Sequence, residues 1–166
     1  MLAEAKNPRG FFTETNAALA KNFLSAGMGA EHLGRVVFHP LEAAYLAKLG
    51  KTSFEKFATA DAFVAAQGKK DKAVAFAFAV YSQIRASGRL LRPYLSHTNF
   101  FRVYAPGVGR EEERPSQLLC LLPGKFPSAK SLSEEVKVAH LARLDLIIAT
   151  GTEKEIRYYK ISSFNW

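Results

Sequence analysis

The side chains best suited to acid–base or metal chemistry in this sequence are four histidines, His32, His39, His97 and His140. No two of them stand four residues apart, the helical spacing that lets two imidazoles bind one zinc ion. The single cysteine, Cys120, cannot supply a cysteine-rich zinc site or an internal disulfide. The residues therefore predict no metal and no cofactor. Cys120 stands in an apolar run and is predicted to be a buried, unreactive thiol.

The sequence contains none of the common motifs of nucleotide binding, nucleophilic catalysis or glycoside hydrolysis. It has no Gly-x-Ser-x-Gly, no Gly-x-Gly-x-x-Gly and no compact acidic pair. Gly68-Lys69-Lys70 looks like part of a phosphate-binding loop, but Phe63 replaces the upstream glycine and Lys70 replaces the Ser or Thr. We interpret these lysines as part of a solvated turn.

The first third of the chain predicts short helices and strands. In order these are a helix over residues 15–26, a strand over 35–38, a helix over 41–49 and a short helix after Thr52-Ser53, with Phe54 and Phe57 on one face. Pro40 suits the first turn of the second helix, and the residue before a proline favours extended backbone. His39, at that position, is therefore interpreted as structural.

The clearest helix is predicted over residues 71–87, with Asp71 as its N-cap and Gly88 just past its end. Beyond it, the pattern predicts strands over 100–104 and 117–122, a helix from Ser131 or Ser133 to residue 143 with Glu134 and Glu135 in its first turn, and a hairpin of strands 146–149 and 156–161. The fold class predicted is α/β (α+β). A small mixed α/β subdomain over residues 1–70 precedes an α/β subdomain with a mixed central sheet over residues 71–166.

Composition agrees with a folded protein, and its positive charge is compatible with an anionic partner or with solubility alone. The 166 residues are 48% hydrophobic and 23% charged, and 23 Lys and Arg against 15 Asp and Glu give a net charge of +8. Such a surplus favours polyanions such as nucleic acid. No apolar run is long enough to cross a bilayer, and the start of the chain lacks a signal-peptide pattern, so we expect a cytoplasmic protein without membrane contact.

Three segments resemble the nuclease domain of archaeal tRNA-splicing endonucleases. They are Tyr81-Ser82-Gln83-Ile84-Arg85-Ala86-Ser87-Gly88 with the later Phe101-Arg102-Val103-Tyr104-Ala105-Pro106-Gly107, then Val138-Ala139-His140-Leu141-Ala142-Arg143, and Ile156-Arg157-Tyr158-Tyr159-Lys160-Ile161 leading to Phe164-Asn165-Trp166. The resemblance covers residues 75–166 in order, and residues 35–50 fit the N-terminal domain of the same family. It implies an endonuclease-like C-terminal subdomain.

The resemblance also implies a chemistry. Family members cut precursor tRNA without metal, leaving 2′,3′-cyclic phosphate and 5′-hydroxyl ends, with a tyrosine as base, a histidine as acid and a lysine that stabilises the phosphorane. Tyr104 matches the family tyrosine. Pro115 stands at the position of the histidine, and Leu144 at the position of the lysine. The catalytic set is therefore incomplete.

This loss resembles the structural subunit of the crenarchaeal-type, two-plus-two heterotetrameric enzyme. The resemblance implies a paralogous catalytic subunit as partner and precursor tRNA with a bulge–helix–bulge as substrate. Partner-binding residues implied in this way are Glu153 and Glu155 in an acidic turn, and Ile156, Tyr158 and Ile161 in the last strand. The same residues are also compatible with an ordinary sheet and a solvated turn.

Two other hypotheses remain open from the sequence. One is an active nuclease with a relocated site, in which His97 or His140 replaces the lost acid from a different backbone position. The other is a stand-alone basic RNA-binding protein, although the chain lacks an aromatic and basic motif such as that of the RRM.

Overall fold

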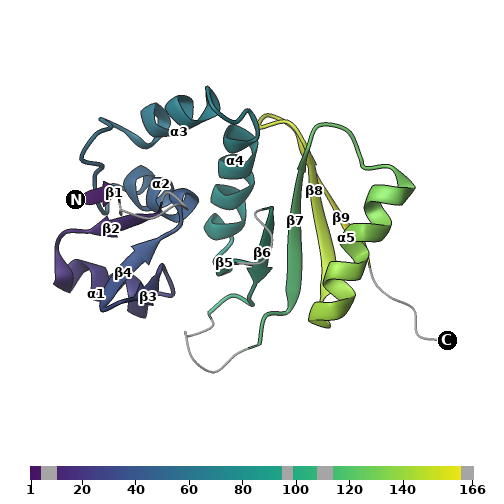
Figure 1. Cartoon of the computed structure of the whole chain (residues 1–166), viewed down its shortest axis with the longest axis horizontal. Helices are drawn as coiled ribbons and strands as arrows, with labels where there is room; N and C mark the ends of the chain where they lie inside the picture. The colour runs from purple at the N-terminus through teal and green to yellow at the C-terminus, as the bar shows by residue number, and fades with distance from the viewer. Residues whose placement is uncertain (5–10, 95–98, 108–113, 162–166) are drawn as a thin grey trace. The chain divides into compact units, whose positions relative to one another are not determined.

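A computed structural model describes residues 1–4, 11–94, 99–107 and 114–161, which divide into two compact units. The division falls between Ser82 and Gln83, inside a helix, whereas the sequence predicts the subdomain boundary ahead of that helix, at residue 70. Each unit has its own sheet, so the predicted α/β (α+β) fold class is confirmed (Figure 1). Within the described ranges, no helix is long and apolar enough to span a membrane.

The first unit contains a four-stranded antiparallel sheet in the order β1-β2-β4-β3. The strands are β1 (Leu2–Glu4), β2 (Phe12–Glu14), β3 (Ala30–His32) and β4 (Arg35–Phe38). The helices are α1 (Ala17–Ser25), α2 (Pro40–Lys48), α3 (Ala60–Gly68) and the first part of α4 (Ala73–Ala86). The helices predicted over 15–26, 41–49 and 71–87 and the strand over 35–38 are confirmed within a few residues.

The short helix predicted directly after Thr52-Ser53 is wrong. The backbone N–H of Leu2 donates to the carbonyl of Ser53 (2.6 Å), and the N–H of Glu55 donates to the carbonyl of Leu2 (3.0 Å). These bonds pair the segment with β1 at Phe54, so its backbone groups are engaged outside a helix.

The next helix, α3, begins at Ala60, where the Thr59 hydroxyl accepts a hydrogen bond from the N–H of Ala62 (3.1 Å). Phe54 packs instead in an aromatic cluster. Its ring stacks on that of Phe63 with 4.6 Å between centroids, and Phe12 and Phe57 meet the Phe63 ring edge-on. Tertiary packing therefore places Phe54 and Phe57 in this cluster, whereas the sequence analysis assigned them to one face of a helix.

His39 caps α2. Its Nδ1 accepts a hydrogen bond from the N–H of Leu41 (3.2 Å), and the carboxylate of Glu42 accepts one from the N–H of His39 (2.9 Å), which completes a capping box. The other oxygen of the buried Glu42 accepts from the N–H of Gly29 (3.1 Å). Burial lowers the pKa of His39 to about 4, so the imidazole is neutral at pH 7.

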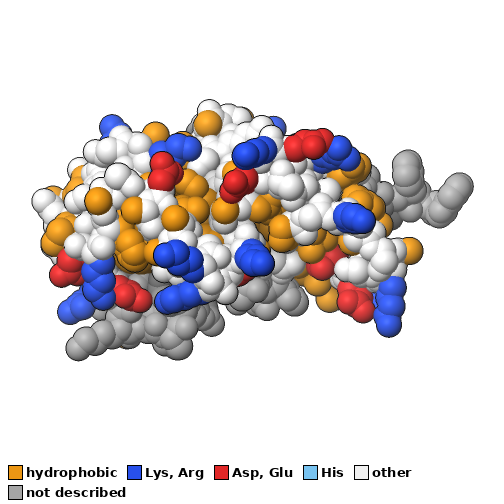
Figure 2. Space-filling model, turned by 90° about the horizontal axis from the view of Figure 1, so that it is seen from above, with side chains coloured by type: hydrophobic (Ala, Val, Ile, Leu, Met, Phe, Trp, Pro, Cys, Tyr) orange, Lys and Arg blue, Asp and Glu red, His pale blue; other side chains and the backbone are white. Residues whose placement is uncertain are grey.

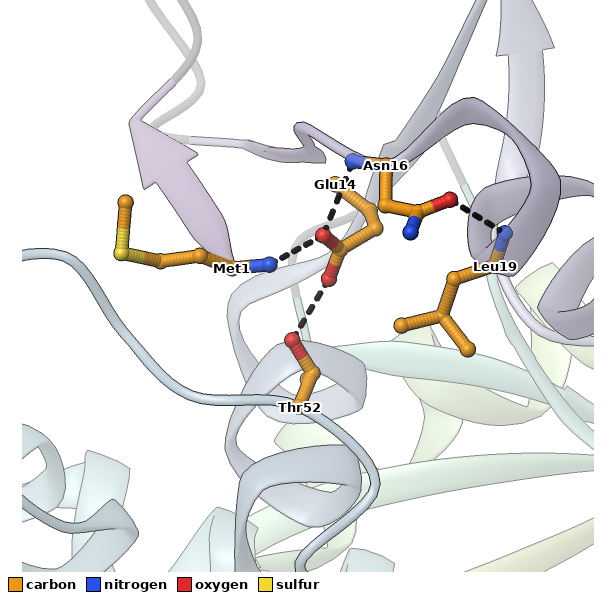
Figure 3. A network of polar contacts seen from close by, with 5 residues as sticks. All are labelled: Met1, Glu14, Asn16, Leu19 and Thr52. Carbon is orange, nitrogen blue, oxygen red and sulfur yellow. Dashed lines mark hydrogen bonds and ion pairs between the residues drawn. The ribbon is translucent and has the colours of Figure 1, made fainter.

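A buried carboxylate, Glu14, ties the amino terminus to this unit (Figure 3). One of its oxygens accepts hydrogen bonds from the α-amino group of Met1 and from the N–H of Asn16 (3.1 Å). The other oxygen accepts from the Thr52 hydroxyl (2.5 Å). Asn16 in turn caps α1 by accepting from the N–H of Leu19 (3.1 Å). Three separate segments are thereby joined at one side chain.

The second unit contains a mixed five-stranded sheet in the order β5-β6-β7-β8-β9, as predicted for the C-terminal part. Its strands are β5 (Leu91–Pro93), β6 (Phe100–Val103), β7 (Gln117–Pro123), β8 (Asp145–Gly151) and β9 (Ile156–Ile161). Only β7 and β8 are parallel, and α5 (Ala129–Ala142) connects them (Figure 1). All four strands predicted here are confirmed, and β5 is an addition.

One face of this sheet packs on α5. The core between them consists of Phe100, Leu118, Cys120, Ala139, Leu146 and Ile148, all nearly inaccessible to solvent. The N-cap of α5 is Ser128, whose hydroxyl accepts from the N–H of Ser131 (3.3 Å), so the caps predicted at Ser131 or Ser133 are wrong. Since the helix begins at Ala129, the glutamates predicted for its first turn lie beyond it.

Candidate functional site

The residues that the resemblance assigns to catalysis are brought to one end of the second sheet. In the strand register, Gln117 of β7 pairs with Val103 of β6 on one side and with Asp145 of β8 on the other. Tyr104 directly follows Val103, Pro115 stands two residues before Gln117, and Leu144 directly precedes Asp145. The end of β6 and the beginnings of β7 and β8 thus carry all three positions.

Tyr104 is a buried residue, with 8% of its surface exposed. Its backbone N–H donates to the carbonyl of Leu90 (3.0 Å), which extends the β5–β6 pairing by one step. The guanidinium of Arg92 lies over its ring, 5.3 Å from the centroid. The side chain therefore packs in the sheet and supports an arginine.

Pro115 is half-buried at the approach to β7. It carries neither a backbone N–H nor an ionisable side-chain group, so it cannot act as a general acid. The next residue, Ser116, donates both its N–H (2.9 Å) and its hydroxyl (3.2 Å) to the carbonyl of Val103. The start of β7 is thus firmly bound to the end of β6.

Leu144 packs against the core cluster beneath α5. The preceding residue, Arg143, ends α5 in the left-handed conformation (φ 56°), and the N–H of Leu144 bonds back to the carbonyl of Ala139 (3.1 Å). This turn directs a leucine onto apolar neighbours at the position that the resemblance assigns to a lysine. Leu144 contributes burial and no charge.

The histidines stand apart from one another in the described residues. His140 is exposed in the last turn of α5, His32 is exposed in β3 of the first unit, and His39 is engaged in the cap of α2. His97 lies outside the described residues. Within the described ranges, no group of three His, Cys, Asp or Glu side chains has a geometry suited to a metal ion.

Cys120 is fully buried in β7, as predicted. Burial raises the pKa of its thiol well above the ordinary value, and the neighbouring Glu135 adds to that shift. Because the thiolate is the reactive form of cysteine, this side chain is unreactive at neutral pH.

The strand singled out for partner binding, β9, is an edge of the sheet, paired only with β8 among the described strands. Residues 157–160 are all exposed, and Ile156 and Ile161 at its ends are half-buried. Tyr158 is 40% exposed and donates its hydroxyl to Gln83 (2.8 Å), and partial burial raises its pKa. Beside Tyr158, an open groove of about 270 Å³ runs over the sheet face, with Ile84, Leu119 and Ile147 in its lining.

The turn before β9 is well defined and acidic. Thr152 and Glu155 exchange backbone hydrogen bonds (3.0 and 3.2 Å), and Gly151 has a φ of 112° and a position where any Cβ would collide with the Glu155 carbonyl. Glu155 accepts from Nε of Arg157 (3.0 Å), and both side chains are largely exposed. Glu153 is exposed and forms no ion pair with any described residue.

The sequence analysis gave no role to Arg92 or Arg102. They are paired directly across β5 and β6. The Phe-Arg-Val-Tyr motif contains Arg102, but β5 has only three residues, one of them Pro93, and gave no strand signal. Only the register of β5 against β6 places the two arginines opposite each other.

Comparison with curated proteins gives an informative match. A tRNA-splicing endonuclease from Thermococcus onnurineus (strain NA1) is 27% identical over 156 residues, which are 90% of this chain and 89% of that protein. This chain is similar to a tRNA-splicing endonuclease over both of its units. Since it covers 90% of the chain, the match includes residues of both units. No family model matches the chain.

Proposed function

We propose that this chain is a structural, non-catalytic subunit of a tRNA-splicing endonuclease. It assembles with a paralogous catalytic subunit into a two-plus-two heterotetramer that excises introns from precursor tRNA at bulge–helix–bulge sites. The observation that carries the proposal is the sheet end with Tyr104, Pro115 and Leu144, in a chain similar to a tRNA-splicing endonuclease over 90% of its length.

The chemistry explains why this sheet end is inactive. In the cleavage, a base removes the proton of a ribose 2′-hydroxyl, the 2′-oxygen forms a bond to phosphorus, and the bond to the 5′-oxygen breaks as an acid protonates it. A cation must stabilise the charge of the phosphorane. Pro115 has no proton to give, Leu144 has no charge, and the Tyr104 side chain is buried. The residues in these positions contribute to packing and not to catalysis.

The edge strand β9 supports assembly with a partner. An exposed edge presents unpaired backbone N–H and C=O groups, to which another chain can add a strand. Residues 157–160 are exposed on both faces of β9, and Ile156, Tyr158 and Ile161 provide apolar surface along it. The hydroxyl of Tyr158 is already bound to Gln83, so its ring is held in place beside the groove on the sheet.

The acidic turn supports the choice of partner. Glu153 and Glu155 extend at the tip of a turn whose backbone is fixed by Gly151 and Thr152. In the proposed assembly, they enter a basic cleft on the neighbouring subunit. Complementary charges of this kind favour the correct partner and register more than they raise affinity.

The test is co-expression with the paralogous catalytic subunit of the same organism, followed by native mass measurement of the complex. The proposal predicts two copies of each chain. A variant with Tyr158→Ala and Ile156→Asp weakens the β9 surface and should reduce the tetramer, whereas Leu141→Asp alters an exposed apolar residue of α5 in the same unit and should leave it intact. Absence of any complex with the catalytic chain would contradict the proposal.

A further inference from the structure

The second sheet has two faces with different surroundings. Strand residues alternate between the faces, and Leu118 of β7 and Ile148 of β8 belong to the core beneath α5. Their immediate neighbours, Leu119 and Ile147, therefore lie on the opposite face, where they line the open groove of about 270 Å³. All residues that line this groove belong to the second unit. The groove is thus open on the face that α5 does not cover.

The groove has an apolar floor and polar groups along its walls. Leu119 and Ile147 provide the floor, and the Tyr158 hydroxyl of β9 donates to the side-chain oxygen of Gln83 in α4 (2.8 Å) at one wall. Because this bond uses the amide oxygen, the NH₂ group of Gln83 remains a donor for a ligand. Gln117 adds a second side-chain amide from β7. An apolar floor with a few amides suits a planar ring that has a hydrogen-bonding edge.

The wall of the groove also carries a cation. Arg89, between α4 and β5, is half-buried and lines the groove. Among the described residues, no acid forms an ion pair with Arg89. A guanidinium of this kind binds two phosphate oxygens at once. The groove therefore favours a ligand that combines a planar ring with an anionic group.

The groove reaches the sheet end that carries the candidate catalytic positions. Val103 and Gln117, which are paired across β6 and β7 at that end, both line it. Arg114 and Arg143 are exposed in the segments that lead into β7 and β8, and no acid among the described residues forms an ion pair with either. Figure 2 shows a face on which basic side chains are scattered among acidic and apolar ones, so the net charge of +8 does not by itself locate a site. The groove and the two arginines together point to a polyanion at this sheet end.

We propose that this groove binds an unpaired nucleotide of RNA. The base lies on Leu119 and Ile147, its polar edge meets the two side-chain amides, and its phosphate binds Arg89. The groove is slightly smaller than the range of about 300–1,000 Å³ that is typical of sites for drug-sized ligands, so it suits a single base. The inference rests on the proposed function, in which the substrate is a precursor tRNA with bulged, unpaired nucleotides.

The test measures binding of the full chain, by fluorescence anisotropy, to a labelled bulge–helix–bulge RNA and to a fully paired RNA duplex of the same length. The wild type should bind the bulged RNA more tightly, because only that RNA offers an unpaired base. Ile147→Trp fills the groove and should lower the affinity for the bulged RNA by about tenfold, while the affinity for the duplex stays unchanged. The control, Leu141→Trp, adds the same ring at an exposed position of α5 and should change neither affinity.

Arg89→Gln tests the phosphate contact. It should lower the affinity for the bulged RNA by about three- to tenfold at low salt and reduce the slope of log K against log salt by about 1. Lys125→Gln removes the same charge from an exposed position after β7 and should leave the preference for the bulged RNA unchanged. Should Ile147→Trp fail to fold, Gln117→Leu, which removes an amide from the groove, carries the same comparison of the two RNAs and should weaken the preference by a few-fold.

The outcomes separate this inference from the proposed function. Equal affinity of the wild type for the two RNAs overturns the nucleotide site, as does an unchanged preference in the folded Ile147→Trp and Arg89→Gln variants, even if the chain assembles with its catalytic partner. Loss of that assembly in Ile147→Trp with the RNA preference intact assigns the groove to a side chain of the partner and also overturns the site. Loss of the preference in the groove variants, together with no complex in the mass measurement, supports the nucleotide site and contradicts the subunit role.

Discussion

The ammonium group of Lys160 lies 2.8 Å from a carboxylate oxygen of Asp145, across the antiparallel pair of β8 and β9. Both side chains are partly exposed, so the ion pair contributes little to stability. This ion pair matters for position 144, because Leu144 directly precedes Asp145. A lysine introduced at position 144 would meet a carboxylate that already has a partner, and would remain available to a phosphate.

This relationship leads to a prediction about restoring the catalytic set that the proposal regards as lost. Pro115→His with Leu144→Lys supplies an acid and a cation at the sheet end that carries Tyr104. We expect weak cleavage of precursor tRNA in a complex whose partner subunit has an inactivated catalytic site, and none by the chain alone, because Tyr104 is buried and Leu144 leaves a packed position. The measurement is end-group analysis of the RNA for 2′,3′-cyclic phosphate and 5′-hydroxyl.

Replacing a packed leucine also has a cost in stability, of about 1–3 kcal/mol, reduced where the lysine stem covers the same apolar surface. The control is therefore Leu144→Lys alone, which should lower the urea midpoint equally and cleave nothing. A folded, assembled double variant without trace of these ends, even with Asp145→Lys added, would contradict our placement of the lost catalytic positions.

Charge reversal of the acidic turn tests the assembly surface. Glu153→Lys with Glu155→Lys should shift the tetramer towards heterodimers, because like charges opposed at an interface cost several kcal/mol. The isolated chain should keep its unfolding midpoint, since both side chains are exposed and the Glu155 carboxylate pairs with an Arg157 that is itself exposed. Size-exclusion chromatography with light scattering gives the readout.

A matched control is Glu31→Lys with Glu134→Lys, which makes the same charge change at exposed positions outside the turn. It should leave the assembly intact. An intact tetramer in the Glu153 and Glu155 variant would show that the turn has no docking role.

Stability should fall in mild acid because of His39. Burial lowers its pKa from 6.5 to about 4, so the unfolded chain binds a proton more readily than the folded one. The stabilisation from the neutral imidazole is complete above about pH 6.5 and is lost as the pH falls towards 4. His39→Asn keeps a capping side chain and should flatten this part of a urea-stability profile. An unchanged profile in the variant would exclude His39 as the source.

The bond between the Met1 amino group and Glu14 predicts that the first unit depends on a free α-amine. Burial by itself raises the pKa of Glu14, but the amine, the Thr52 hydroxyl and the N–H of Asn16 together lower it. Acetylation of the amine, or Glu14→Gln, should destabilise the chain by about 1–3 kcal/mol, because a buried polar group loses its partner. Urea unfolding at pH 7 measures this, with Glu4→Gln as an exposed control. Equal midpoints would refute the dependence.

Much of the fold was accessible from the sequence because local signals agreed with the final packing. The strand over residues 35–38, the His39-Pro40 boundary and the hairpin after Asp145 each combine an apolar pattern with a clear turn residue. Strands β1, β2, β3 and β5 have three residues each, too few for a periodic signal. The segment at Phe54 was mistaken for a helix because its bond to Leu2 joins residues far apart in the chain.

The candidate site shows the same limit. Tyr104, Pro115 and Leu144 were proposed from the resemblance of their motifs, and the strands β6, β7 and β8 beside them were predicted from apolar runs in the sequence. The pairing of Arg92 with Arg102 depends on how β5 joins the sheet. The contact between the Met1 amine and Glu14 depends on how the terminus reaches a buried carboxylate. Neither contact has a local signature.

The central claim, that catalysis belongs to the partner, is tested most directly by cleavage of a bulge–helix–bulge precursor tRNA by the purified chain alone and with the paralogous catalytic subunit. The account predicts no cleavage by the chain alone, with or without Mg²⁺, and cleavage to 2′,3′-cyclic phosphate and 5′-hydroxyl ends by the complex. Robust cleavage by this chain alone, abolished by Tyr104→Phe, would contradict it.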